Sequence, residues 1–368
     1  MISNLEELQR LSNVLGLIQN ETIDFSSEEI IFSDFKKSSL EFHQCYIIAN
    51  KICFENINNP QLSIRFSECS IVADIEFTNC EFQNLEFYEV ENLKSLKVSK
   101  GYEDSSKLIL DRFYFYYNEN TDINTDCNFS FSGCIFKNEF LIDNLNQTSG
   151  HFIIEKSKFG IDPTDKNYSN FYFGASNYNN ACIIDNVFNK RASFVKSTFD
   201  YKIEDLTHKK YKNTMFSRNV FHDIGFVECD FRLKCSFYNC DFEGIAYFER
   251  ILNNRNSDLT FIECQFQKYT TFIGAQITTF LLERSSFQGI VSFQDTIFKV
   301  LKIDKPHFDK IAYFDGIQIT EINNCDIRTI RTIKQQLQKA ENRIDYNRFR
   351  AYELSAYYKE LKWNENFK

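Results

Sequence analysis

The sequence contains little glycine, proline, methionine or tryptophan. Its 368 residues include 11 Gly, 3 Pro, 2 Met and one Trp. This excludes collagen-like and Gly/Pro-rich low-complexity chains, and a hydrophobic share of 43% excludes extensive disorder. Glycine-rich phosphate-binding loops are absent from the sequence, as are the G-x-S-x-G and H-E-x-x-H motifs. We therefore expect no catalytic residues, no cofactor and no enzymatic activity.

The sequence also lacks an uninterrupted apolar run of about 18 residues, the length that a membrane-spanning helix requires. Its first residues, Met1-Ile-Ser-Asn-Leu-Glu-Glu7, are acidic and have neither the basic start nor the apolar centre of a secretory signal. We therefore expect a cytoplasmic protein, in a compartment where thiols remain reduced. In that setting the twelve cysteines are metal ligands, nucleophiles or packing residues.

Charge is unevenly distributed along the chain. The net charge is −9, but residues 328–368 carry ten Lys/Arg and five Asp/Glu, whereas the preceding 327 residues carry 32 and 46. This asymmetry marks a boundary and predicts different contacts for the two parts. We expect no nucleic acid bound directly along the acidic part, because phosphate contacts need clustered Lys and Arg.

Phenylalanine recurs with a period of five residues. Phe216, Phe221, Phe226 and Phe231 stand five apart, and the sequence contains ten such Phe pairs, where random placement gives about four. The period matches neither an α-helix nor a β-strand. It predicts a chain that turns a corner every five residues, with one large side chain pointing inward per segment. Four segments would form a turn of about 20 residues, and the turns would stack about 4.8 Å apart.

The cysteines share this register. Eleven of the twelve stand two positions before a Phe or Ile: Cys45, Cys69, Cys80, Cys127, Cys134, Cys182, Cys229, Cys235, Cys240, Cys264 and Cys325. Positions two apart in an extended chain point to the same side, so each thiol is expected to face inward beside its large neighbour. The same small-residue slot is occupied elsewhere by Ser157, Ser197, Ser285, Thr296 and Ala192. Because the sequence has no C-x-x-C and no zinc-ligand spacing to its five His, we interpret the cysteines as core residues and expect no metal.

The pattern small-x-[Phe/Ile] resembles the repeat of the pentapeptide-repeat proteins. It is seen in Cys229-Asp-Phe231, Cys240-Asp-Phe242, Cys264-Gln-Phe266 and Ser285-Ser-Phe287. The resemblance covers residues 22–327, most clearly 216–327, and implies an all-β solenoid, a right-handed quadrilateral parallel β-helix. The chain differs from the family pattern in using Phe where Leu is commoner, and in often lacking Asp or Asn before the central residue.

Four stretches interrupt the period and are predicted to be loop insertions, near residues 99–126, 160–180, 201–214 and 250–258. Loops on a rigid scaffold often carry binding residues. The first stretch contains the aromatic cluster Phe113-Tyr-Phe-Tyr-Tyr117. We interpret this cluster as a strand or loop packed against the side of the solenoid, with a partner-contact patch as the alternative.

Helices are predicted at both ends of the solenoid, where a coil would otherwise expose unpaired backbone. Residues 1–21 form the N-terminal cap, because Ser3-Asn-Leu-Glu6 is a capping-box pattern and apolar residues with helical spacing follow over residues 4–18. The five-residue period ends after Ile327. The basic segment 328–368 then predicts a short helix, a break near Asn342 and a second helix from about Asp345 to Lys362.

The C-terminal segment is similar to the helical region of membrane-linked bacterial pentapeptide-repeat proteins, on the basis of Ala340-Glu-Asn-Arg343, Phe349-Arg-Ala-Tyr-Glu353 and Tyr357-Tyr-Lys-Glu-Leu361. There it joins the repeat domain to transmembrane helices, so the resemblance implies a position at the inner face of the membrane, where positive charge is retained. The alternatives are a cap that docks on the acidic solenoid and a dimerisation helix. The candidate partner or membrane-side surface comprises Lys339, Arg343, Arg348, Arg350, Lys359, Lys362 and Trp363.

Two functions are consistent with these features. The first is a non-catalytic protein-interaction scaffold or sensor domain, a homo-oligomer through its C-terminal helices and the cytoplasmic part of a membrane-associated or oligomeric bacterial assembly. The second is an acidic DNA mimic that binds a topoisomerase or another DNA-binding protein, as some pentapeptide-repeat proteins do. Only four of the eleven Cys-x-[Phe/Ile] units carry an acid at the middle position, which disfavours a continuous acidic stripe. We therefore expect a scaffold with an unidentified protein partner.

Overall fold

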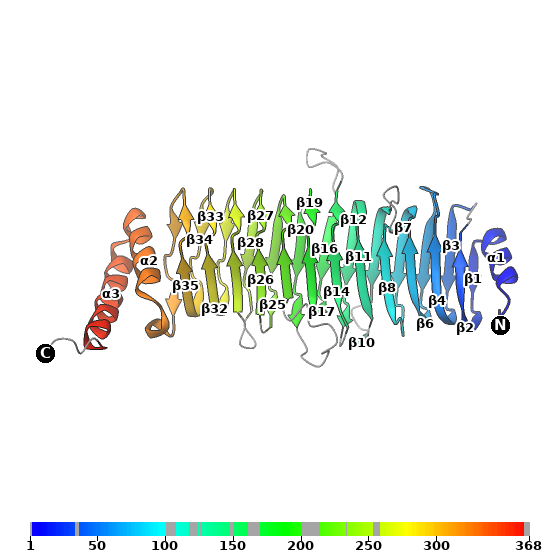
Figure 1. The fold of residues 1–368 in the computed structure, drawn as a ribbon, viewed down its shortest axis with the longest axis horizontal. Coiled ribbons are helices and arrows are strands. Elements are labelled where there is room, and N and C mark those ends of the chain that lie inside the picture. The colour runs from blue at the N-terminus through cyan, green and yellow to red at the C-terminus, as the bar shows by residue number, and fades with distance from the viewer. Residues whose placement is uncertain are drawn as a thin grey trace. The chain divides into compact units, whose positions relative to one another are not determined.

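The computed structural model describes residues 2–33, 37–100, 108–117, 124–125, 127–147, 150–160, 170–200, 214–232, 234–252 and 258–363. The chain divides into two compact units, Met1–Ser193 with Ser197–Lys212 and Phe194–Lys196 with Asn213–Lys368. Each unit is a stack of parallel β-coils, with a helix before the first coil of unit 1 and helices after the last coil of unit 2 (Figure 1). The predicted fold class, a parallel β-solenoid with helices at both ends, is confirmed.

Unit 1 contains three sets of parallel strands. Pairing within a set joins strands of successive coils, except that the second set takes two strands, Lys158–Phe159 and Asn170–Gly174, from one coil. The first set is β2 (Thr22–Phe32), β4 (Tyr46–Glu55), β6 (Ser70–Thr78), β8 (Ser95–Ser99), β11 (Asn128–Ser132), β14 (Phe152–Glu155) and β18 (Ala181–Ile184). The second set is β1 (Leu17–Gln19), β3 (Ser39–His43), β5 (Ser63–Ser67), β7 (Glu81–Tyr88), β9 (Ile109–Tyr116), β12 (Ile135–Asp143), β15 (Lys158–Phe159), β16 (Asn170–Gly174) and β19 (Val187–Phe188). The third set is β10 (Asn124–Thr125), β13 (Asn146–Gln147), β17 (Asn177–Asn179) and β21 (Thr198–Asp200).

Unit 2 is built in the same way from shorter strands. One set is β22 (Thr214–Ser217), β26 (Lys234–Tyr238), β29 (Asp258–Ile262), β32 (Gln276–Glu283), β35 (Ile297–Asp304) and β38 (Gln318–Ile319). A second is β23 (Val220–Phe221), β27 (Asp241–Phe242), β30 (Gln265–Phe266), β33 (Ser286–Phe287) and β36 (His307–Phe308). A third is β24 (Ile224–Val227), β28 (Ala246–Glu249), β31 (Thr270–Thr271), β34 (Val291–Ser292) and β37 (Ala312–Tyr313). The remaining strands are β20 (Ala192–Val195) and β25 (Asp230–Phe231).

The core of each unit consists of phenylalanine ladders. In unit 2, Phe266, Phe287 and Phe308 occupy equivalent positions in three successive coils, so that coil repeats every 21 residues, close to the predicted 20. The Phe266 and Phe287 rings stack with their centroids 4.5 Å apart. In unit 1 the Phe54 and Phe77 rings stack in the same way at 4.6 Å. These separations match the spacing between neighbouring strands, so ring stacking and the backbone ladder repeat together.

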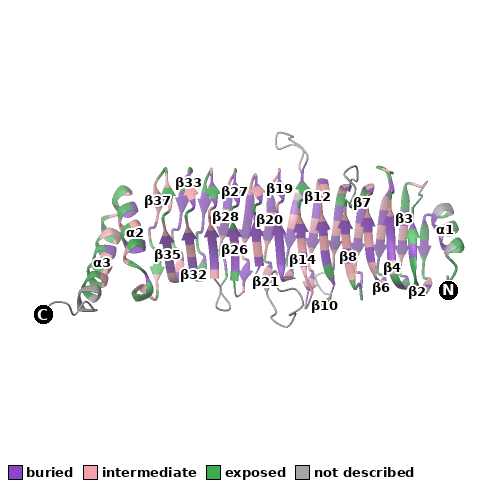
Figure 2. Cartoon of the chain, in the orientation of Figure 1, coloured by how far each residue is buried: buried purple, intermediate pink, exposed green. Residues whose placement is uncertain are grey.

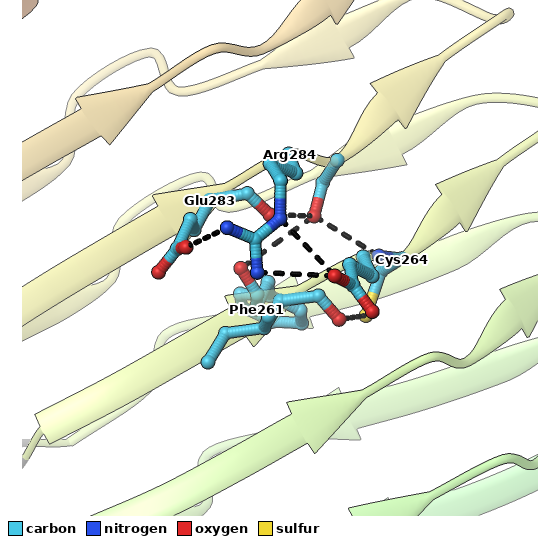
Figure 3. Close-up of polar contacts among 7 residues, drawn as sticks. Phe261, Cys264, Glu283 and Arg284 are labelled. Atoms are coloured by element: carbon cyan, nitrogen blue, oxygen red, sulfur yellow. Dashed lines mark hydrogen bonds and ion pairs between the residues drawn. The ribbon is translucent and has the colours of Figure 1, made fainter.

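The small-residue slot lies at a corner of the coil, and its side chain donates a hydrogen bond. Cys264 Sγ donates to the carbonyl oxygen of Phe237 at 3.4 Å, and Ser285 Oγ donates to that of Phe261 at 3.5 Å. The residue just before the slot is left-handed, with φ of 57° at Glu263 and 45° at Arg284. Figure 3 shows this corner, where the Cys264 amide also donates to Ser285 Oγ at 3.1 Å. In these two coils the slot residue is therefore a donor as well as a small side chain, whereas the sequence pattern predicted only a small side chain.

All twelve cysteines are free and buried, but they do not all occupy the predicted slot. Cys182 is the clearest exception. Its neighbours Ala181 and Ile183 align with the buried Phe152 and Ile154 of the adjacent strand, so Cys182 points to the opposite side of β18. The expectation that every one of the eleven faces inward beside its large neighbour is therefore wrong at Cys182.

The predicted insertions contain regular coil strands. Within 99–126, β9 pairs with β7 and β12 along nearly its whole length, and within 160–180 the strands β16 and β17 continue the coils. In the aromatic cluster, Phe113, Phe115 and Tyr117 are buried and belong to the core, while Tyr114 and Tyr116 lie on the outer surface. The predicted insertion at 201–214 lies outside the described residues except for Thr214, which begins β22. In the stretch 250–258, Leu252 bridges to Asp230 and Asp258 begins β29.

The N-terminal helix α1 (Leu5–Val14) begins one residue later than the capping-box pattern indicated. The Oδ1 atom of Asn4, rather than Ser3, caps it by accepting from the Glu6 amide at 2.9 Å. The helix ends at Val14 instead of residue 18, because Gly16 adopts a φ of 70° and β1 then begins the first coil. A side chain at Gly16 would meet the Ser39 carbonyl oxygen at 2.9 Å, so the chain needs glycine there.

Three helical segments follow the last coil: the short 3-10 helix η1 (Ile322–Asn324), α2 (Ile327–Lys339) and α3 (Arg343–Trp363). Asp326 caps α2 by accepting from the Thr329 amide at 2.7 Å. Ile330, Ile333 and Leu337 of α2 are buried, as is Phe349 of α3. Two helices with a break near Asn342 were predicted, and this is what the structure contains. Figure 2 shows that the strands are mostly buried, whereas α3 is exposed along much of its length.

Candidate functional site

The helices α2 and α3 cover the final coil of unit 2 through hydrogen bonds to its backbone. Thr329 Oγ1 accepts from the Ile303 amide at 2.8 Å, and Gln336 Oε1 accepts from the Ala312 amide at 3.2 Å. Asp345 of α3 accepts from the Gly316 amide at 3.1 Å, and Arg348 donates to the Ile317 carbonyl oxygen at 2.9 Å. Side chains thus replace the strand that the last coil would otherwise need for pairing.

An ion-pair cluster centred on Glu353 holds α3 against α2. One Glu353 oxygen accepts from Arg331 Nε at 2.7 Å, and the other pairs with Lys334. The hydrogen bonds from Lys334 and then Arg331 lower the pKa of the Glu353 carboxyl. Asp345, the other described acid of α3, pairs with Arg348 at 3.0 Å. Both acids are therefore used on the side of α3 that faces the solenoid or α2.

The opposite side of α3 presents an apolar stripe to solvent. Ile344 is 84% exposed, Leu354 62% and Tyr358 60%, and Ala351 lies between them. Positions 344, 351 and 358 are one heptad apart, and 354 stands at the second apolar position of the same heptad. We call these four residues the α3 stripe. Such a run of exposed apolar residues on one helix face is typical of a contact surface.

The predicted surface residues do not all lie beside this stripe. Lys339, Arg343 and Arg350 are exposed. Arg348 is not a free surface cation, because it pairs with Asp345, bonds to the Ile317 carbonyl oxygen and lies 5.4 Å from the centre of the Phe349 ring. Three further residues, Lys359, Lys362 and Trp363, belong to α3, and their side chains lie outside the described part of the structure.

Sequence reasoning identified the basic residues of α3 but missed the α3 stripe. In the structure Phe349 is buried, whereas Tyr357 is 49% exposed. The signal that could have revealed the stripe was the heptad spacing of Ile344, Ala351 and Tyr358.

Three of the buried cysteines are poorly suited to nucleophilic or metal-binding chemistry. Burial raises the pKa of the Cys80, Cys134 and Cys182 thiols to about 12, so they remain protonated near neutral pH. The Cys80 and Cys134 thiols donate to backbone carbonyl oxygens of Phe54 and Val98. A protonated thiol that donates a hydrogen bond to the backbone packs in the core and is a poor nucleophile.

The fold defines the chain as a β-solenoid repeat protein. No family model, curated protein or solved structure matches it. Among the helices that the structure describes, none combines the length and apolar character needed to cross a bilayer.

Proposed function

We propose that this chain is a non-catalytic protein-interaction module of the pentapeptide-repeat type, whose contact surface is the α3 stripe. The main support is the exposure of Ile344, Leu354 and Tyr358 on one face of α3, at 84%, 62% and 60%. The described acids of α3 form ion pairs on its other side. The five-residue Phe period and the corner slots support the repeat type. The free, buried cysteines support a cytoplasmic module, in a compartment where thiols remain reduced.

The proposed partner element is an acidic amphipathic helix of another protein. An apolar stripe at heptad spacing accepts the apolar face of a second helix, with flanking charges selecting that partner. Arg343 and Arg350 border the α3 stripe and are exposed, so acids on the partner helix would complement them. The solenoid and α2 then act as a rigid support that presents α3.

Two other occupants are less well supported by the same surface. A second copy of α3 would bring Arg343 and Arg350 against identical residues or one another, which like-charge repulsion disfavours. A lipid surface favours a broad apolar face, whereas Asn347 and Ser355 share the exposed side of α3 with the stripe. Homo-oligomer formation and membrane binding are therefore tested as competing outcomes.

The DNA-mimic function is disfavoured by the alternation of charge between coils. Arg65 lies between Glu41 and Glu86, at 3.8 and 3.6 Å. In unit 2, Arg284 pairs with both Glu263 and Glu283. Figure 3 shows the pair with Glu283. A DNA mimic needs a continuous acidic surface, and interleaved arginines reduce such a field.

The experiment uses a designed helical peptide with Leu at the heptad core positions and Glu at the flanking positions. Its binding to the full chain is measured by fluorescence anisotropy, beside a matched peptide with Lys in place of Glu. We expect the acidic peptide to bind at least about tenfold more tightly. The variants Ile344→Ser and Leu354→Ser should each weaken binding by about tenfold or more.

Leu15→Ser provides the matched control, because Leu15 is 60% exposed and lies at the end of α1. It should leave peptide binding unchanged. Sedimentation of the unbound chain and flotation with anionic vesicles test the competing occupants. Equal binding of the acidic and basic peptides, or an Ile344-dependent dimer or vesicle complex in their place, would reject the proposed partner.

A further inference from the structure

A second surface feature lies in unit 1, where the outer face of three adjacent strands carries tyrosines and carboxylates. The register places Glu86 of β7, Tyr114 of β9 and Leu141 of β12 in one row across the sheet. The next outward row consists of Tyr88, Tyr116 and Asp143. All six side chains are half-buried. They come from sequence positions far apart and meet only because the coils stack.

A shallow cavity of about 360 Å³ opens on this grid, lined by Glu86, Tyr114, Tyr116, Leu141 and Asp143. We call it the tyrosine cavity. This volume falls within the range of about 300–1,000 Å³ that is usual for small-ligand sites. Its lining combines one aliphatic side chain, two aromatic rings and two carboxylates.

The aromatic walls are held in place by hydrogen bonds and ring contacts. The Tyr116 hydroxyl donates to Glu86 Oε1 at 2.5 Å, and the Tyr114 hydroxyl donates to Glu139. Tyr88 packs against Tyr116 with ring centroids 4.9 Å apart. Because each phenol donates to a carboxylate, its ring becomes richer in electrons and its face more attractive to a cation.

The far side of the tyrosine cavity is bordered by Tyr172 of β16, which aligns with Leu141. A side chain at Gly174 would collide with the Tyr172 ring, so glycine lets this ring lie back over its own strand. Burial, and then the negative charge of Asp143, raise the pKa of the Tyr172 hydroxyl. The ring therefore lies close to Asp143 and extends the aromatic wall.

The described lining of the cavity is acidic. It contains the carboxylates Glu86 and Asp143 beside two tyrosines. Among the described residues around it, Arg65 lies 3.6 Å from Glu86, and Arg112 lies 3.6 Å from Glu139. Carboxylates therefore lie beside aromatic side chains at this surface.

We propose that the tyrosine cavity binds an organic cation, either an alkylammonium or a guanidinium group. Aromatic rings and carboxylates attract such a cation, and the Leu141 side chain can contact its alkyl part. The source is either a free small molecule or the side chain of a Lys or Arg on another protein. The site lies in unit 1 and shares no residue with the α3 stripe, so the two proposals can fail separately.

The test compares cations with neutral molecules of the same shape, by calorimetric titration of the full chain. Choline against 3,3-dimethylbutanol probes the free small molecule, and N-acetyl-arginine amide against N-acetyl-citrulline amide probes the protein side chain. We expect at least one cation to bind about fivefold or more tightly than its neutral counterpart. Tyr116→Ala and Asp143→Asn should each weaken that binding by about fivefold.

Tyr46→Ala is the matched control, because Tyr46 is an exposed tyrosine of β4 in the same unit, and it should leave binding unchanged. Circular dichroism of Tyr116→Ala establishes that the coils remain folded. If that variant unfolds, Asp143→Asn alone decides the outcome. Equal affinity for cation and neutral isostere in both pairs, or full binding by both folded variants, overturns the proposal.

Discussion

At several corners of the coil, the small residue fits the space and also donates a hydrogen bond. Thr296 Oγ1 donates to the Phe272 carbonyl oxygen at 2.7 Å, and Ser197 Oγ to that of Phe173 at 3.0 Å. Cysteine, serine and threonine thus serve the same purpose, since each is small and carries one hydrogen-bond donor. Alanine would fill the space but leave a buried carbonyl oxygen without this donor.

Replacement of Ser285 separates the effect of size from that of hydrogen bonding. Ser285→Ala should lower the free energy of unfolding by about 1–2 kcal/mol, because Ser285 Oγ donates to the carbonyl oxygens of Glu283 at 3.0 Å and Phe261 at 3.5 Å and accepts from the Cys264 amide. Ser285→Cys should cost less, since a thiol keeps the donor. Urea denaturation measures both, with the exposed Ser355→Ala as control. Equal stability of the Ala and Cys variants would contradict a donor requirement.

The left-handed residue before each slot explains how a chain with so little glycine turns so many corners. The structure contains left-handed φ values at Gln44, Glu68, Asn79, Asn239 and other non-glycine residues. Such a residue costs about 1 kcal/mol relative to glycine, except that Asn tolerates it better. Scarcity of glycine in the sequence therefore did not indicate scarcity of left-handed turns.

Asn239 offers a direct test of this backbone requirement. It is exposed, has a φ of 49° and precedes the slot residue Cys240. Asn239→Gly should leave the melting temperature equal or higher, whereas Asn239→Val should lower the free energy of unfolding by about 1–2 kcal/mol. The pair is compared by thermal and urea unfolding. A Val variant as stable as the Gly variant would show that the corner relaxes out of the left-handed region.

At the scale of elements, α2 and α3 act as a lid on the last coil, and ion pairs fasten the second helix to the first. The lowered pKa of Glu353 means that its charged form is stabilised in the folded chain. That stabilisation is present above the unfolded-state pKa of about 4.3 and is lost as the pH falls through the folded value. Protonation should therefore loosen α3 while the phenylalanine core remains intact.

Glu353→Gln tests the ion-pair cluster. At pH 7 the variant should show faster hydrogen exchange in α3 than the wild type, by up to about fivefold, because Arg331 and Lys334 lose a charged partner. The difference should shrink as the pH falls through the lowered pKa of Glu353, because the wild-type carboxyl then becomes protonated as well. The exposed Glu243→Gln is the control, and it should leave α3 exchange unchanged at every pH. A pH-independent effect of Glu353→Gln would point to packing rather than charge.

At the scale of the whole molecule, the repeated core was predictable because residues close together in the sequence specify it. A Phe every five residues and a small residue two before it specify inward positions without reference to distant parts of the chain. The helix break near Asn342 was equally local. The same reasoning placed 99–126 outside the coil, because its inward residues Phe113 and Phe115 are spaced by two, as in an ordinary strand.

The surfaces were not predictable in the same way, because they depend on coil length. Phe66 pairs with Phe87, 21 positions later, whereas Phe87 pairs with Phe115, 28 positions later. The meeting of Tyr88, Tyr116 and Asp143 depends on these unequal intervals. A sequence pattern identifies which residues face outward in one coil, but the register between coils decides which of them become neighbours.

The phenylalanine ladders predict how a local defect spreads through unit 2. Phe248 stacks on Phe226 and Phe272, with centroids 5.2 and 4.9 Å away, and meets the edge of Phe261 at 5.2 Å. Because each coil is stabilised mainly by its neighbours, removing this ring weakens the coils on both sides. Phe248→Ala should lower the free energy of unfolding by about 3–5 kcal/mol.

Phe248→Leu distinguishes filling of the coil from aromatic stacking. If volume dominates, the leucine variant should lose no more than about 1.5 kcal/mol, and a ladder of leucines would serve as well as one of phenylalanines. If stacking contributes, the loss should be larger, because two stacked and several edge contacts disappear.

Urea unfolding gives the free energies of both variants. Hydrogen exchange should show that the Ala variant opens first at β24, β28 and β31, the strands that carry or adjoin these rings. Tyr238→Ala, at a 43% exposed aromatic, should change neither quantity appreciably. A Phe248→Ala variant no less stable than this control would mean that the ladder is not what holds the coils together.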